Sequence, residues 1–187
     1  QQHRATYDER VAEPMAALAD ALEDEFGEPK VFRPYRDVRF SKDKSPYQLH
    51  ASMAAPGRHD GGTLYLQVGL EGLLVAGGWW QPQTQALTRF RHAVDDPKVA
   101  RSFDRQRARL ETEGLALDAD PLKTAPRGWD RDHPRLDLLR MRNLAFTSTT
   151  PPGPDVGSAQ CLDLVVGAFR HLERWNGWLA EHVGARD

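Results

Sequence analysis

The chain has 187 residues; 40% are hydrophobic, 28% are charged, and the formal net charge is −2. These proportions are typical of a globular protein and exclude a disordered or fibrous chain. The slight negative charge excludes the overall basic excess of a general DNA or RNA coat protein, so any anion site has to be local.

Length and cysteine content limit the organisation and the compartment. A chain of this length suits one hydrophobic core and contains no long linker, so we expect a single domain over residues 1–187. The longest apolar run, residues 72–80, is far shorter than the roughly 20 residues of a membrane-spanning helix. The one cysteine, Cys161, cannot form an internal disulfide and fits a reducing cytoplasm. We therefore expect a soluble, cytoplasmic protein without membrane contact.

A helix is predicted first, because apolar residues recur every three or four positions over residues 5–26. Pro14 interrupts this pattern, so either the helix kinks there or a second helix begins with Pro14 in its first turn. The stripe keeps its phase, which favours the kink. After a short extended piece at residues 30–32, alternating apolar and polar residues predict a half-buried strand over 47–53.

Two further strands, residues 63–70 and 73–80, are expected to complete an antiparallel meander. The remaining pattern predicts helices at 83–94 and 96–113, an edge strand at 115–117, a short helix after Pro134, a strand at 144–149 and a long terminal helix with its apolar stripe over 162–183. Helices before and after a strand cluster favour an α+β fold with a mainly antiparallel sheet. Several helices, including the long C-terminal one, are expected to cover it.

Two turn-rich segments carry a local positive charge. Residues 33–50 hold five Lys or Arg against two Asp, and residues 123–135 hold four against two, with His133 among them. Loops at the ends of strands and helices commonly carry binding groups on a rigid support. We expect these two segments to border one basic pocket.

The first basic segment also resembles a known family. Its pattern is Arg33-x-x-Arg36-Asp37-x-Arg39-Phe40-x-x-Asp43-Lys44-x-x-Tyr47. This spacing is similar to the signature of the widespread, mainly bacterial domain of unknown function family 2461, as are segments 7–14, 122–128 and 132–134. The resemblance implies no reaction, substrate or cofactor. It does imply that an N-terminal helical segment found in relatives is missing before Gln1.

The basic pocket is expected to bind a small anionic ligand, phosphorylated or carboxylated, because guanidinium groups bind paired oxygens with two hydrogen bonds. The expected ligand-binding residues are Arg36, Arg39, Lys44, Tyr47, His50, Lys123, Arg127 and His133. In a structural alternative, Asp37 and Asp43 pair with neighbouring arginines and hold an irregular loop. In a second functional alternative, the basic surface is an interaction module for an acidic protein segment or nucleic acid, with Trp129 at its centre.

The strand pattern suggests a floor for this pocket. If Leu64 and Leu66 face the covering helices, Tyr65 and Gln67 lie on the opposite face of the sheet, and His50 shares that face. The alternative is a solvated polar face, which is common in antiparallel sheets.

His133 is a candidate general acid or base that Asp130 or Asp132 could orient. In the alternative, it caps or precedes the short helix that Pro134 opens. Because Arg131 intrudes and no second pair of ligands stands at a typical spacing, the cluster does not predict a metal site. The sequence assigns no catalytic residue, cofactor or oligomeric state, and leaves open whether the protein is an enzyme.

Overall fold

Six strands form one antiparallel sheet in the order β1-β2-β3-β4-β6-β5. The computed structural model describes residues 2–35, 47–156 and 158–184. The strands are β1 (Lys30–Val31), β2 (His50–Ala55), β3 (Thr63–Gly69), β4 (Gly72–Trp79), β5 (Ala116–Asp118) and β6 (Leu144–Thr150). The predicted α+β fold with an antiparallel sheet is confirmed.

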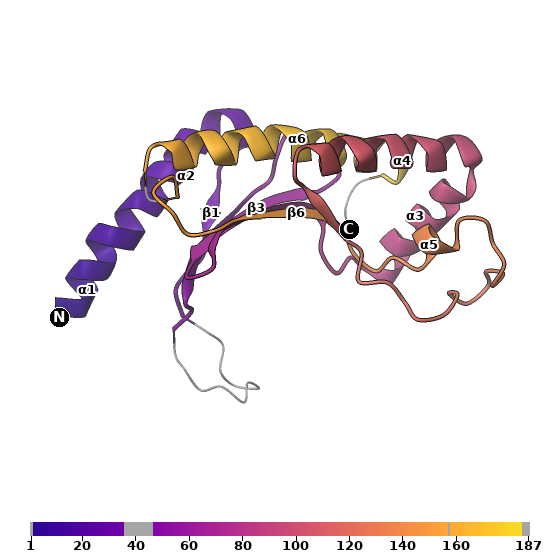
Figure 1. The fold of residues 1–187 in the computed structure, drawn as a ribbon, viewed down its shortest axis with the longest axis horizontal. Coiled ribbons are helices and arrows are strands. Elements are labelled where there is room, and N and C mark those ends of the chain that lie inside the picture. The colour runs from indigo at the N-terminus through magenta and orange to yellow at the C-terminus, as the bar shows by residue number, and fades with distance from the viewer. Residues whose placement is uncertain (1, 36–46, 157, 185–187) are drawn as a thin grey trace.

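The helices are α1 (Gln2–Tyr7), the π-helix η1 (Asp8–Ala12), α2 (Glu13–Phe26), α3 (Thr84–Asp95), α4 (Pro97–Thr112), α5 (Leu136–Leu139) and α6 (Gln160–His182). In Figure 1, α2 and α6 lie on one side of the sheet, and α4 continues this helical layer beyond it. None of the helices among the described residues is long and apolar enough to span a membrane.

The meander of β2, β3 and β4 is confirmed, but the predicted start of its first strand is wrong. β2 begins at His50, and Tyr47 forms only an isolated bridge with Tyr35. Leu49 is largely exposed. The alternation of Tyr47 and Leu49 therefore belongs to the approach to the sheet, where no strand among the described residues continues the ladder.

Pro14 lies in the first turn of α2, and the backbone is helical on both sides of it. The helical geometry changes before it, in η1, where the Glu13 N–H donates to the Asp8 carbonyl five residues back. A proline lacks an N–H and crowds the carbonyl four residues earlier. The wider π-turn and the position of Pro14 in the first turn of α2 relieve both problems, and no break separates η1 from α2.

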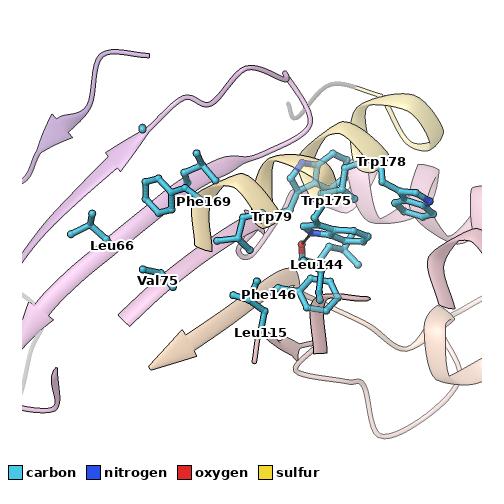
Figure 2. Packing of buried hydrophobic residues seen from close by; sticks show 14 of the residues in the cluster. Leu66, Val75, Trp79, Leu115, Leu144, Phe146, Phe169, Trp175 and Trp178 are labelled. Atoms are coloured by element: carbon cyan, nitrogen blue, oxygen red, sulfur yellow. Dashed lines mark hydrogen bonds between the residues drawn. The ribbon is translucent and has the colours of Figure 1, made fainter. Parts of the chain in front are cut away.

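The long helix α6 covers the centre of the sheet, as predicted. The core lies between them, where Leu66 and Val75 form a buried cross-strand pair and Phe169 packs from α6 (Figure 2). Trp175 is fully buried further along α6, and its Nε1–H donates to the Leu144 carbonyl at 2.9 Å. Trp175 thus stabilises the junction between α6 and Leu144, the first residue of β6.

The opposite face of the sheet carries the polar residues that the alternation predicts. Ser52 pairs with Gln67, and Ala54 pairs with Tyr65, which places both side chains of β3 away from α6. The two are half-buried, and the Tyr65 hydroxyl donates to Gln67 Oε1 at 2.9 Å. These polar groups bind one another on the uncovered face.

Candidate functional site

Three of the sequence-predicted site residues, Arg36, Arg39 and Lys44, lie outside the described residues. Tyr47 is exposed, and its ring contacts that of Tyr35 at 5.5 Å between centroids. His50 begins β2 and lines an apolar cavity at that end of the sheet.

Lys123 and Arg127 are exposed on the segment between β5 and α5. The backbone there is held by a hydrogen bond from the Leu122 N–H to the Arg140 carbonyl at 2.7 Å. Neither Lys123 nor Arg127 lines either of the two cavities described here. A single pocket shared with residues 33–50 stays a prediction.

His133 has partners on both ring nitrogens. Nδ1 accepts the Arg135 N–H at 3.1 Å, and Nε2 lies 3.0 Å from Asp95 Oδ1. The expectation that Asp130 or Asp132 orients this ring is wrong: Asp95, at the C-terminus of α3, occupies that position, whereas Asp130 accepts the N–H of Asp132. The contacts tie the start of α5 to α3.

Trp129 packs beside this pair instead of standing free at the surface. Its ring centroid lies 5.6 Å from that of His92 and 5.5 Å from that of His133. Part of the aromatic surface that base stacking would need is therefore used in packing against the core.

A groove of about 630 Å³ lies between α4 and α6, where sequence reasoning placed no site. Three permanent cations line it: Lys98 and Arg105 from α4, and Arg174 from α6. Two histidines, His59 and His182, also line it, and the lining contains one carboxylate, that of Glu181. The lining is completed by Val99, Ser102, Gln106, Gly177, Trp178 and Glu181.

The three cations have no carboxylate partner among the described residues. In the described parts of the chain, no acidic side chain lies within ion-pair distance of the Lys98 ammonium or of the Arg105 and Arg174 guanidinium groups. Glu181 instead lies 3.8 Å from His182. Unpaired like charges around a concave surface create a field that attracts anions.

The floor of the groove is rigid. Trp178 is buried and stacks on Trp175 with ring centroids 5.0 Å apart. Its Nε1–H donates to Ser102 Oγ at 3.0 Å, which leaves the Ser102 hydroxyl hydrogen free to donate elsewhere. The groove therefore offers a neutral donor among the cations.

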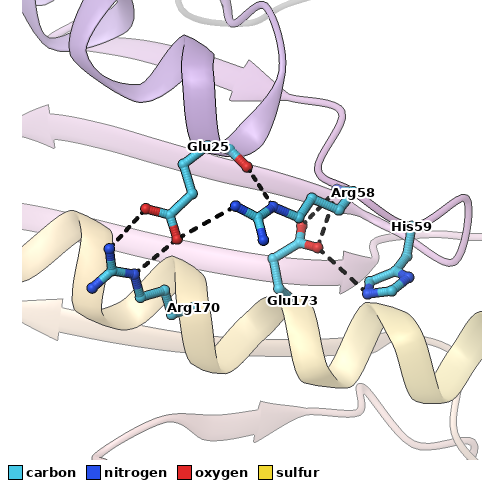
Figure 3. A network of polar contacts seen from close by, with 5 residues as sticks. All are labelled: Glu25, Arg58, His59, Arg170 and Glu173. Atoms are coloured by element: carbon cyan, nitrogen blue, oxygen red, sulfur yellow. Dashed lines mark hydrogen bonds and ion pairs between the residues drawn. The ribbon is translucent and has the colours of Figure 1, made fainter.

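The loop of residues 56–62, which joins β2 to β3, forms one wall. Both carboxylate oxygens of Glu173 accept the Arg58 N–H at 3.1 Å, and the Arg58 Nε–H donates to the Glu25 carbonyl at 2.8 Å (Figure 3). Glu25 in turn accepts two hydrogen bonds of 2.8 Å from Arg170. The network fixes the loop to α2 and α6 at once.

Arg170 affects the titration of Glu25. Its hydrogen bond holds the pKa of Glu25 below the ordinary value of 4.5, and the same contact raises the pKa of Arg170. A carboxyl group with a lowered folded-state pKa stabilises the protein above its unfolded pKa, and this contribution is lost as the pH falls through the folded pKa.

Glu25→Gln is therefore expected to lower Tm slightly at neutral pH, by about 1–2 °C, because the Arg170 side chain of this pair is exposed to solvent, although that of Glu25 is partly buried. The difference from the wild type should begin to shrink as the pH falls below 4.5, and it should vanish once the pH lies below the lowered pKa of Glu25, where the wild-type carboxyl is protonated too. Differential scanning calorimetry across this range checks it. A difference that persists in acid would assign the loss to packing instead of charge.

The second cavity, of about 850 Å³, is largely apolar and lies where α2, the start of α6 and the ends of β2 and β3 meet. Cys161 lines it and is buried, as the apolar stripe of its helix predicts. Burial raises the pKa of the Cys161 thiol, which disfavours a reactive thiolate. The cavity lacks the gathering of cations found between α4 and α6.

The chain matches the family described as "Conserved hypothetical protein (DUF2461)" over residues 1–178. It belongs to the DUF2461 family. This confirms the resemblance seen in the sequence, and the family description assigns no activity. Comparison of this DUF2461 chain with curated proteins and with solved structures finds no match.

The groove of this DUF2461 domain leaves only a weak signal in the sequence. Lys98, Ser102 and Arg105 follow one another at spacings of four and three, which places them on one face of α4. Arg174 and Glu181 are seven apart on α6. The pattern identifies a polar helix face, but the packing of α4 beside α6 is what turns it into a groove.

Proposed function

We propose that this DUF2461 domain binds a small anionic ligand, phosphorylated or carboxylated, in the groove between α4 and α6. The observation that carries the proposal is a set of three cations, Lys98, Arg105 and Arg174, around one concavity in a chain of net charge −2; in the part of the chain that the structure describes, none of them has a carboxylate partner. Ser102 adds a neutral donor at its floor. Hydrogen bonds from guanidinium groups to phosphate or carboxylate oxygens are among the stronger ones in proteins.

In addition to the groove, the loops at residues 33–47 and 123–133 remain predicted anion-binding segments. A cytoplasmic, bacterial setting is likewise part of the proposal, supported by the single cysteine and the resemblance to a mainly bacterial family. Binding is proposed without a reaction.

Titration calorimetry with inorganic phosphate and pyrophosphate tests the groove. Arg105→Ala and Arg174→Ala should each weaken binding about tenfold, since one charge-assisted hydrogen bond is worth about 1.5 kcal/mol or more. The matched control is Arg101→Ala, which removes an exposed cation from α4 that does not line the groove. Its affinity should equal that of the wild type.

Two results would contradict the groove. If Arg101→Ala weakens anion binding as much as the groove variants do, the anion is attracted by the surface charge in general. If Lys123→Ala weakens binding and Arg174→Ala does not, the site lies in the loop before α5. Single-stranded oligonucleotides serve as the other arm: tight binding that falls steeply with salt, with no metabolite-sized anion bound, would favour the interaction module.

A further inference from the structure

His59 stands on the wall of the groove opposite the α4 cations and is held there by contacts that α6 supplies. Its ring lies against the backbone of Gly177: a Cβ built at residue 177 would lie 3.3 Å from His59 Nε2. The side chain remains 48% exposed and lines the groove. A larger residue than glycine at this point of α6 would push the ring away.

The carboxylate of Glu173 lies behind the same ring. Its Oε2 is 3.9 Å from His59 Nε2, and the Glu173 side chain is only 10% exposed. Both of its oxygens already accept the Arg58 N–H, so the carboxylate is fixed beneath the loop (Figure 3). His59 thus sits between a buried negative charge and a groove lined by cations.

We propose that His59 is a pH-sensitive anion-binding residue: its protonation adds a further cation to the groove and strengthens anion binding below neutral pH. This rests on the proposed anion-binding function. An imidazole ordinarily titrates near pH 6.5, the range in which such a change matters in cells.

Charged groups of both signs lie near His59. The cations Lys98, Arg105 and Arg174 and the carboxylate of Glu181 line the groove with it, and the Glu173 carboxylate lies 3.9 Å from its ring. Asp60 follows it in the loop, and His182 is the other titratable cation of the groove. A bound anion offsets the repulsion from the three permanent cations, so binding and protonation promote each other by reciprocal linkage.

Sulfate is the suitable probe, because it remains a dianion across this pH range and any pH dependence then comes from the protein. Calorimetry at about pH 5.5 and about pH 8 should give the wild type about five- to tenfold tighter sulfate binding at the lower pH. His59→Gln should bind with nearly equal affinity at both. His59→Lys should bind tightly at both, because its charge is permanent.

His182→Gln is the matched control and should keep most of the pH dependence. A wild type that binds sulfate equally at both pH values overturns the role of His59 and leaves anion binding intact. The role is also overturned if His59→Gln keeps the full dependence while His182→Gln loses it. No sulfate binding at either pH, with the wild type folded, overturns the proposed function itself.

Discussion

Replacing Trp175 with alanine is expected to lower the free energy of unfolding by about 4 kcal/mol, within the range of about 3–5 for truncating a buried aromatic residue. The side chain is fully buried, and the rings of Phe103 and Phe146 contact it edge-on. The Trp178 ring stacks on it, as Figure 2 shows. Truncation leaves a cavity among rings that cannot close around it. It also leaves the Leu144 carbonyl without its donor.

Chemical denaturation with Trp80→Ala as the control checks this prediction. Trp80 follows Trp79 at the end of β4 but is 53% exposed, so its loss should cost no more than about 0.5 kcal/mol. Trp175→Phe separates the two contributions, because it keeps a ring and removes only the N–H donor; about 1–3 kcal/mol is expected for the unpaired carbonyl. A small effect of Trp175→Ala would contradict the packing of α6 against β6.

The sequence predicts well those helices and strands whose apolar residues recur with the period of the face that they bury. Along β3 every second residue is apolar, and Leu64 and Leu66 are indeed buried under α6 while Tyr65 and Gln67 lie on the other face. The long stripe of α6 has the same origin. In both cases one covering layer buries one face, so the period of the sequence matches the geometry.

Local patterns fail where the outcome depends on partners distant in the chain. Tyr47 continues the alternation of β2, but only an isolated bridge to Tyr35 is available there. His133 has two aspartates within three residues, yet its partner is Asp95, which is 38 positions away. Residues close in sequence are the obvious candidates for a hydrogen-bond partner of His133. In the fold, however, the C-terminus of α3 lies against the imidazole ring.

The candidate groove was missed for the same reason. Sequence reasoning favoured runs of neighbouring cations, as in residues 33–50 and 123–135, because these can be counted along the chain. In the groove Lys98 and Arg174 come from helices far apart in the sequence, and His59 comes from a third segment. Each looks like an isolated surface charge until α4 and the loop of residues 56–62 are placed beside α6.

Gly61→Ala is expected to be strongly destabilising, with a loss of about 3 kcal/mol in the free energy of unfolding. A Cβ at residue 61 would lie 1.9 Å from the carbonyl oxygen of Asn176 and 2.5 Å from the backbone nitrogen of Ala180. Both atoms belong to the backbone of α6, so no rotation of a side chain relieves the overlap. The loop of residues 56–62 has to lift from the helix.

Gly167→Ala is the matched control on α6 itself. No atom lies within 4 Å of a Cβ built there, and alanine is favoured over glycine inside a helix, so a gain of about 0.5–1 kcal/mol is expected. Thermal and urea unfolding of the two variants should therefore shift in opposite directions.

Because lifting the loop also withdraws His59 from the groove, Gly61→Ala should lose the pH dependence of sulfate binding while Arg105 and Arg174 still bind the anion. A Gly61→Ala protein with wild-type stability would show that the loop does not rest on α6 in solution, and His59 would then have no fixed place beside the cations.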